Sequence, residues 1–341
     1  MYTPSEKRYD NMIYNKCGES GLRLPAVSLG MWHNFGLQDN FENMKKMCFT
    51  AFDCGITHFD LANNYGFPNI GSAEENVGKI LKDHFSAHRN ELIISTKAGY
   101  RMWEGPYGDF GSRKYLLSSL DDSLKRLKLD YVDIFYHHRP DSDTPLEETI
   151  GALDSAVKSG KALYAGLSNY DGKTMQKAAE IFKRLNCPFV INQNSYSILN
   201  RTVEKNSLLE CAEKEKKGVI IFSPLSQGLL TDKYLGGIPE NSRIKTSGIY
   251  LKESNLTDDL LNKIEKLNGI AKNRNQTLAQ MALSWVLSKK SVTSVLIGAS
   301  SSEQIKENAR AVHSAQFTKD ELEMIDRHLG EFCVNRISFQ T

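Results

Sequence analysis

The sequence predicts an α/β protein of the (β/α)₈ class, a TIM barrel, and three observations support this prediction. Short apolar runs of strand length alternate with longer segments of helical periodicity along most of the 341 residues. Eight strand–helix pairs can be recognised, the number that closes a parallel barrel in a chain of about 250 residues or more. The strand-like runs are apolar almost throughout, as parallel strands covered by helices are. We therefore expect one barrel domain spanning residues 1–341.

The expected elements follow one another in a regular order. Strands are expected at residues 26–32, 57–62, 92–99, 132–140, 162–169, 189–196, 219–226 and 294–300. The helices that follow them are expected at residues 41–55, 73–85, 112–129, 145–160, 172–186, 207–218, 278–290 and 301–312. In the first helix, Met44, Met47 and Phe52 recur at helical spacing. In the fourth, the stretch TPLEET predicts a capping box, with Thr144 as the N-cap and Glu147 reaching back.

Two segments lie outside this alternation. Residues 14–25 carry Gly18 and Gly21 as turn residues and predict a β-hairpin that closes the bottom of the barrel. Residues 226–258, after the seventh strand, are far longer than the usual connection in such a barrel, and loops of this length tend to be functional lids. This second segment also carries Lys233, Arg243 and Lys245. We expect it to cover a bound cofactor.

A doubly wound open sheet is the alternative fold. Such a sheet usually has a glycine-rich GxGxxG turn after its first strand. Here the first strand runs into SLGMWHNFG, which lacks that pattern. The closed barrel is therefore the better prediction.

The composition excludes several function classes. A net charge of +2 and a pI near 8.1 give no argument for nucleic acid or a membrane surface as a partner. The first residues lack the apolar core of a signal peptide, and no apolar run reaches membrane-spanning length. We therefore expect a cytoplasmic protein.

The cysteines and histidines do not predict a metal site. The six cysteines are scattered without a CxxC pair, which is typical of reduced thiols in a cytosolic protein. His137 and His138 are adjacent, so on a strand they would point to opposite faces. No metal ligands are predicted.

Chemistry-bearing side chains are concentrated at the strand ends. Asp60 ends the second strand, with Tyr65 in the loop beyond it, Lys97 ends the third strand, and His138 lies at the end of the fourth. In a (β/α)₈ barrel the C-terminal strand ends converge on the face that holds the active site. Lys97 can neutralise the Asp60 carboxylate, which would otherwise be costly to bury.

This set of residues suits proton donation to a carbonyl oxygen. A phenol is too weak an acid at neutral pH unless positive charge nearby stabilises the phenolate. Lys97 would supply that charge, Asp60 would hold the ammonium group, and His138 would orient the substrate oxygen. The blander alternative is that Asp60 and Lys97 form only a structural ion pair.

The remaining strand ends suggest the source of electrons. Ser168 and Asn169, with Gln193, offer hydroxyl and amide groups for a carboxamide, and Phe222 offers a ring for stacking. After the eighth strand, a Gly-Ala-Ser turn opens a helix, and a helix N-terminus is a natural phosphate site.

The pattern resembles the aldo-keto reductase superfamily, whose members are NADPH-dependent (β/α)₈ oxidoreductases. The resemblance extends from residue 21 to about Leu329. The stretches FDLANNYG, GSAEEN, ISTKAGY and GGIPENSR are closest to one branch. That branch holds the bacterial L-glyceraldehyde-3-phosphate reductases and the β subunits of voltage-gated potassium channels.

The resemblance implies a role for each matching residue. The catalytic tetrad would be Asp60, Tyr65, Lys97 and His138. The NADPH site would comprise Trp32, Gln38, Asp60, Ser168, Asn169, Gln193, Phe222, Ser223, Pro224, Leu225, Gln227, Lys233, Arg243, Gly298, Ser300, Gln304, Glu307 and Asn308. A small aldehyde would contact Trp32, Trp103, Tyr107 and Arg113.

Two details bear on specificity. Many reductases have an arginine near position 301 to bind the 2′-phosphate, whereas this chain has Ser301, so the resemblance implies NADPH less strongly than it implies a nicotinamide cofactor. Arg113, at the start of the third helix, is a candidate for binding a substrate phosphate, although a helix-surface role is the blander alternative.

Three functions remain open from the sequence. The first is reduction of small aldehydes or ketoaldehydes, such as L-glyceraldehyde 3-phosphate or methylglyoxal, by NADPH. The second is an aldolase in which Lys97 forms a Schiff base. The third is a non-catalytic NADPH-binding subunit of a larger assembly. His138 favours an active reductase, because the channel-subunit branch often lacks this histidine. The resemblance also implies a homo-oligomer, a tetramer or larger.

Overall fold

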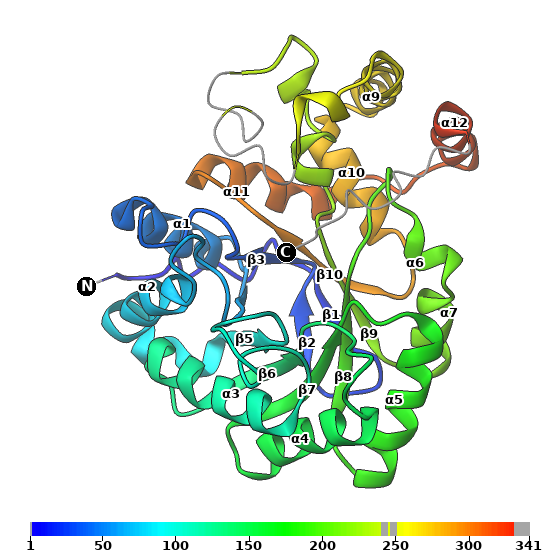
Figure 1. The fold of residues 1–341 in the computed structure, drawn as a ribbon. Helices are drawn as coiled ribbons and strands as arrows, with labels where there is room; N and C mark the ends of the chain where they lie inside the picture. Colours follow the sequence, from blue (N-terminus) through cyan, green and yellow to red (C-terminus); the bar gives the residue numbers. More distant parts are fainter. Residues whose placement is uncertain (1, 240–244, 246–250, 331–341) are drawn as a thin grey trace.

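The computed structural model describes residues 2–239, 245 and 251–330 and shows a closed barrel of eight parallel strands (Figure 1). The strands are β3 (Val27–Gly30), β4 (His58–Asp60), β5 (Ile93–Ala98), β6 (Val132–His137), β7 (Ala162–Ser168), β8 (Phe189–Ser195), β9 (Gly218–Phe222) and β10 (Val292–Ile297). They neighbour one another in sequence order, and β10 pairs with both β9 and β3, which closes the ring. The predicted barrel and the predicted order of its strands are confirmed.

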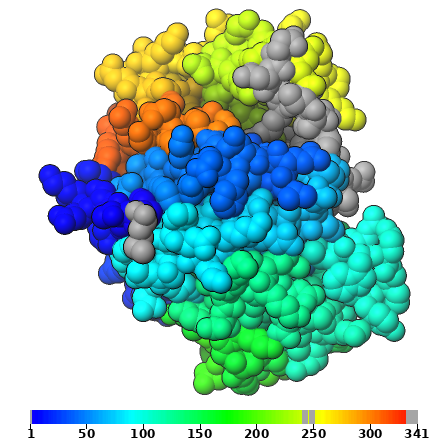
Figure 2. All heavy atoms as spheres, turned by 90° about the vertical axis from the view of Figure 1, so that its left-hand side faces the viewer, coloured from blue at the N-terminus to red at the C-terminus, as the bar shows by residue number. Residues whose placement is uncertain are grey.

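Helices cover the outside of this barrel (Figure 1). The helices are α1 (Phe41–Asp53), α2 (Ser72–Ile80), α3 (Arg113–Leu127), α4 (Leu146–Lys158), α5 (Gly172–Leu185), α6 (Thr202–Lys205), α7 (Leu208–Lys214), α9 (Asp258–Asn273), α10 (Leu278–Leu287), α11 (Ser302–Ala309) and α12 (Lys319–Leu329). Of these, α9 and α12 lie farther from the strands, packed against each other, and α9 also packs against α10. Shorter turns are η1 (Leu81–Phe85), η2 (Ser86–Glu91), η3 (Ser226–Gly228), η4 (Asp232–Tyr234), η5 (Glu253–Asn255) and η6 (Arg310–His313). In Figure 2 the blue surface of the first strand–helix unit lies directly against the orange surface of the last. The two ends of the repeating series therefore meet, as closure requires.

The predicted hairpin closes the end of the barrel opposite the strand C-termini. Strand β1 (Tyr14–Lys16) pairs antiparallel with β2 (Arg23–Pro25). Apolar side chains of the hairpin, Cys17, Leu22 and Leu24, pack with strand residues of the barrel interior. Gly18, in the turn, has φ +57°, and a Cβ there would lie 2.0 Å from the carbonyl oxygen of Lys216. Only glycine allows this close approach, so the hairpin packs closely against the loop before β9.

The predicted capping box at α4 is wrong. The helix begins one residue later than the capping box requires, with Pro145 as its N-cap and no side-chain cap. The Thr144 hydroxyl instead donates to Asp141, within a turn that precedes the helix. The helical residue three positions after the N-cap is therefore Glu148, and its carboxylate accepts from the backbone N–H of Arg113 at 3.0 Å.

The predicted element list is also incomplete. No helix is predicted between the seventh strand and residue 278, yet α9 lies there. Its sequence signal is present: the Thr257 side chain accepts from the backbone N–H of Leu260, and apolar residues recur at helical spacing behind it. Among the described residues, none of the helices is both long and apolar enough to cross a membrane.

Two histidines are fully buried in the barrel wall. On β4, His58 contacts the hydroxyls of Ser28 and Ser95. On β6, the Nδ1 atom of His137 lies 2.7 Å from the Tyr170 hydroxyl. Burial lowers the pKa of each imidazole from 6.5 to about 4. Both are therefore neutral in the folded protein near neutral pH.

We expect the free energy of unfolding to fall as the pH is lowered from about 6.5 towards 4. In that window the unfolded chain binds protons at His58 and His137 that the folded chain does not. At about pH 5 the loss is on the order of 2 kcal/mol for each histidine. Urea denaturation at about pH 7 and about pH 5 measures it. His137→Asn should show a smaller difference between the two pH values, and a wild-type stability that is equal at both would contradict the expectation.

Candidate active site

The structure brings Asp60, Tyr65, Lys97 and His138 together at the C-terminal end of the barrel. Lys97 Nζ donates to Asp60 Oδ2 at 2.5 Å and to the Leu61 carbonyl at 2.5 Å, and both charged groups are buried. The Tyr65 ring centroid lies 5.0 Å from Lys97 Nζ and 6.0 Å from the centroid of the His138 ring. The predicted convergence of these side chains is therefore what the structure shows.

Strand register and one glycine turn explain this convergence. Asp60 pairs with Ser95 across β4 and β5, and residues two apart on a strand share a face, so Lys97 projects beside Asp60. Tyr65 lies in the loop after β4. Its carbonyl accepts from the backbone N–H of Gly71 at 2.9 Å. The next residue, Gly66, has φ +100°, where a Cβ would lie 2.3 Å from the Ser72 hydroxyl oxygen. The loop therefore turns sharply at Gly66, and this turn holds the Tyr65 phenol above the C-terminal strand ends.

Lys97 and His138 differ in their charge states. Burial lowers the pKa of Lys97, whereas the Asp60 carboxylate opposes that effect. Burial also holds the pKa of His138 well below its usual 6.5, and the positive charge of Lys97 lowers it further. His138 therefore presents a neutral imidazole at the cavity wall, and a neutral imidazole can donate one N–H to a substrate oxygen.

A buried chain of hydrogen bonds runs from Asp60 into the barrel wall. Asp60 Oδ1 accepts from the Ser95 hydroxyl at 2.7 Å, and Ser95 Oγ lies 2.9 Å from His58 Nε2. His58 Nδ1 lies 3.0 Å from Ser28 Oγ, which is 2.7 Å from Ser294 Oγ. A carboxylate can only accept, so Ser95 donates to it and accepts from the His58 Nε2–H. The carboxylate thus sets the direction of every hydrogen bond in the chain, through strands β5, β4, β3 and β10.

This chain was not predicted, although a sequence signal for it exists. His58 precedes Asp60 by two positions and Ser95 precedes Lys97 by two, so each pair lies on one face of its strand. Polar residues at such spacing in an apolar strand indicate an inward-facing polar network. A third donor, Gln193 Nε2, reaches Asp60 Oδ1 at 3.1 Å. The Asp60 carboxylate is therefore hydrogen-bonded by three side chains from two strands, β5 and β8.

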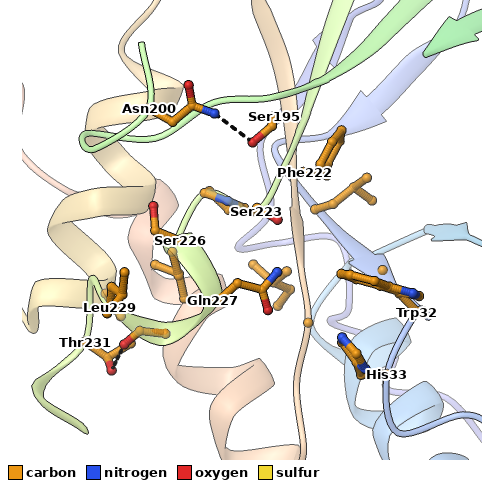
Figure 3. A pocket seen from close by; sticks show the side chains of 18 of the residues that line it. Trp32, His33, Ser195, Asn200, Phe222, Ser223, Ser226, Gln227, Leu229 and Thr231 are labelled. Atoms are coloured by element: carbon orange, nitrogen blue, oxygen red, sulfur yellow. Dashed lines mark hydrogen bonds between the residues drawn. The ribbon is translucent and has the colours of Figure 1, made fainter. Parts of the chain in front are cut away.

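A cavity of about 1930 Å³ opens above these residues at the strand C-termini. Its lining includes many of the predicted site residues: Trp32, Asp60, Tyr65, His138, Asn169, Gln193, Phe222, Ser223, Pro224, Leu225, Gln227, Lys233, Gly298, Ser300, Gln304, Glu307 and Asn308. Figure 3 shows Trp32 and His33 on one side, with Gln227 pointing toward them from the loop after β9. Residues from nearly every strand end therefore share one large cavity.

The turn after β9 has an unusual backbone. Ser223, Ser226 and Gln227 have φ of 54°, 47° and 60°, in the left-handed region. Each such non-glycine residue costs about 1 kcal/mol or more. Strain of this kind is concentrated at ligand-binding sites, and this turn lies on the cavity wall.

Known proteins of similar sequence identify the family of this chain. Residues 26–329 match the model of the aldo/keto reductase family. The chain belongs to the aldo/keto reductase family. It is 53% identical to the proteins named L-glyceraldehyde 3-phosphate reductase of Escherichia coli O157:H7 and of strain K12, over 97% of this chain and 96% of each relative. It is also 35% identical to a probable voltage-gated potassium channel subunit beta of rice, over 88% of this chain and 91% of that protein.

As an aldo/keto reductase the protein is an oxidoreductase, and the barrel fold expected of the family is confirmed. Ser301, where many reductases are expected to have arginine, is the N-cap of α11 and accepts from the backbone N–H of Gln304 at 3.4 Å. In this reductase the residue therefore has a local structural role.

Several predicted site residues lie outside the cavity lining. Ser168 is buried behind it, 3.3 Å from Asn169 Nδ2. Gln38 is exposed on the loop after β3, and Trp103 and Tyr107 are exposed on the loop after β5. Arg243 falls outside the described residues.

Arg113, the predicted phosphate ligand, is also absent from the lining. Its guanidinium donates to the Gly151 carbonyl at 3.1 Å and to the Ser155 hydroxyl at 2.8 Å on α4. These two contacts join helices on the outside of the barrel. The structure therefore does not bring Arg113 together with Asp60, Tyr65, Lys97 and His138.

We expect Ser95→Ala to lower kcat by about tenfold, because the Asp60 carboxylate loses one of its hydrogen-bond donors and holds Lys97 less firmly. The rate is measured with saturating aldehyde and cofactor. Ser294→Ala, at the far end of the same chain, is the matched control and should lower kcat much less. An equal loss in both variants, or none in Ser95→Ala, would show that the chain does not position Asp60.

Proposed function

We propose that this protein reduces small aldehydes and ketoaldehydes with NADPH, with Tyr65 as the proton donor. The observation that carries the proposal is the position of the Tyr65 ring, 5.0 Å from the buried Lys97 ammonium and beside the His138 imidazole. A nearby cation makes a phenolate easier to form, and a positioned acid speeds carbonyl chemistry by about 10²–10⁴-fold.

The cavity fits a dinucleotide as well as a substrate. Typical small-molecule sites occupy about 300–1,000 Å³, and this one has about 1930 Å³. Asn169 and Gln193 would hold the carboxamide, Phe222 would stack on the ring, and Gln304 and Asn308 would contact the adenosine end, all of them on the cavity wall. When bound, the reduced nicotinamide supplies a hydride to the carbonyl carbon.

Each residue of the tetrad then has a separate task. His138, held neutral, donates to the carbonyl oxygen and orients it. Tyr65 transfers its proton to the same oxygen as negative charge develops there. Lys97 stabilises the resulting phenolate, and Asp60 fixes the ammonium group in place. The close relatives named L-glyceraldehyde 3-phosphate reductase support a phosphorylated three-carbon aldehyde as a substrate, and methylglyoxal remains a second candidate.

The contacts of Lys97 argue against the Schiff-base alternative, although burial lowers the pKa of its ammonium group. The ammonium group is buried, is bonded to Asp60 and Leu61, and is not part of the cavity lining. A non-catalytic subunit would also bind the cofactor, so turnover distinguishes it from a reductase. A cytoplasmic location and a homo-oligomeric state stay predictions.

We expect Tyr65→Phe to lower kcat by about 10²–10⁴-fold while NADPH binds as before. The variant keeps the aromatic ring and removes only the acidic hydroxyl. NADPH oxidation is followed across a panel of phosphorylated and free short aldehydes, and binding is followed by titration of the cofactor. A variant as fast as the wild type would exclude Tyr65 as the donor. A wild-type protein that binds NADPH but reduces no aldehyde would instead support the non-catalytic subunit.

We also expect NADPH to bind about tenfold or more tightly than NADH, because a 2′-phosphate gains a charge-assisted hydrogen bond. Lys233 and Lys272 are the lysines that line the described part of the cavity. Titration of Lys272→Met and of Lys233→Met with both cofactors shows which lysine contributes to the preference for NADPH over NADH. Equal affinities of the wild type for NADPH and NADH would contradict the expected preference.

A further inference from the structure

We propose that Arg139 binds the phosphate group of a phosphorylated short aldehyde, and that it, rather than Arg113, distinguishes such substrates from free aldehydes. This inference rests on the proposed function. Arg139 follows His138 at the end of β6 and lines the cavity, with 25% of its side chain exposed.

The Tyr100 ring sets an upper limit on the distance from the Arg139 guanidinium to the His138 imidazole. The His138 ring meets the Tyr100 ring edge-on, with centroids 4.6 Å apart. The Arg139 guanidinium carbon lies 4.4 Å from the same Tyr100 centroid. The guanidinium is therefore no more than about 9 Å from the His138 imidazole.

A three-carbon aldehyde phosphate can span this distance. Its carbonyl oxygen would lie within hydrogen-bond distance of His138, about 3 Å from the ring nitrogen. The phosphorus follows the carbonyl carbon by four bonds of about 1.5 Å each. Phosphate oxygens accept from a guanidinium at about 2.8 Å. A terminal phosphate on a substrate held by His138 and Tyr65 can therefore reach Arg139, whereas free glyceraldehyde or methylglyoxal has no group to place there.

The Arg139 guanidinium is already held in one orientation. Its Nε donates to the Gly99 carbonyl at 2.8 Å, and Nη2 donates to Asp109 Oδ1 at 2.8 Å. The Phe110 ring centroid lies 4.9 Å from the guanidinium carbon, so two aromatic rings flank it. These contacts use two of the five N–H donors of an arginine. The other donors have no acceptor among the described residues and can receive phosphate oxygens.

The other cationic residues of the cavity come from other elements of the fold. Besides Arg139, the lysine and arginine residues among the described lining residues are Lys233 on η4 and Lys272 on α9. Lys272 also lines a smaller cavity together with Tyr234 and Leu235, beyond the loop after β9. Asp109 offsets part of the Arg139 charge, but a phosphate carries nearly two negative charges and binds arginine as a fork. Among the lining cations of the described residues, Arg139 is thus the one that directly follows a tetrad residue, His138.

The test compares L-glyceraldehyde 3-phosphate with L-glyceraldehyde in the full-length protein with NADPH. For each variant the measured quantity is the ratio of the two KM values. Arg139→Met should raise KM for the phosphorylated aldehyde relative to the free one by about 10- to 100-fold. Arg139→Lys, which keeps the charge but loses the fork, should give a smaller rise. Arg113→Met is the matched control and should leave the ratio as in the wild type.

A merely structural role would give a different result. If Arg139 only anchored the loop through Asp109, Arg139→Met and Asp109→Asn would raise both KM values together, and the proposal would be overturned. If the phosphate subsite exists, Asp109→Asn keeps the cation and leaves the ratio unchanged or lower. A changed ratio in Arg113→Met with none in Arg139→Met would also overturn it.

Direct binding separates this inference from the proposed function. With NADP⁺ saturating the cofactor site, inorganic phosphate should bind to the wild type and at least about tenfold more weakly to Arg139→Met. That result would stand even if no aldehyde were reduced. Equal phosphate affinity in the two proteins would overturn the subsite while leaving the reductase activity intact.

Discussion

The Asp60–Lys97 ion pair is the interaction on which the rest of the site depends. Burying two opposite charges is costly, and an apolar pair of the same size would often be as stable. The pair is tolerated because every charged atom has partners: Lys97 has two acceptors, and Asp60 has donors from Ser95, Gln193 and Lys97. Removing either partner would leave an uncompensated buried charge, at a cost of about 3–5 kcal/mol. The ion pair adds little stability, but it lies beside the Tyr65 phenol and the His138 imidazole. Its presence is therefore best explained by a role in the proposed reaction.

Much of the fold could be predicted because one physical rule acts eight times. A parallel strand covered on its outer face by a helix must be apolar, so each strand of the barrel is visible as an apolar run. The same rule makes the site recognisable in the sequence, because a charged residue such as Asp60 or Lys97 at the end of an apolar run needs a neighbour that neutralises its charge. The hairpin was predictable for a different reason: Gly18 and Gly21 mark a turn between two short segments that precede the first strand.

What could not be predicted depends on contacts between distant segments. The serines of the buried chain look like ordinary strand residues until the register brings Ser28, His58 and Ser294 together. Arg113 and Arg139 look alike in the sequence, and only the packing of α3 against α4 directs the first away from the cavity. Thr144 satisfies the capping pattern, but the turn at Asp141 competes for its hydroxyl. In each case a partner far along the chain, or a competing local one, decides the outcome.

The hairpin at the closed end of the barrel has a consequence for the order of events. Cys17, Leu22 and Leu24 pack against the barrel interior at that end, and the described cavity lies at the other end, above the strand C-termini. Under the proposed function, the cofactor and the aldehyde would therefore enter from the same face. The ligand that binds deeper would then have to bind first and leave last.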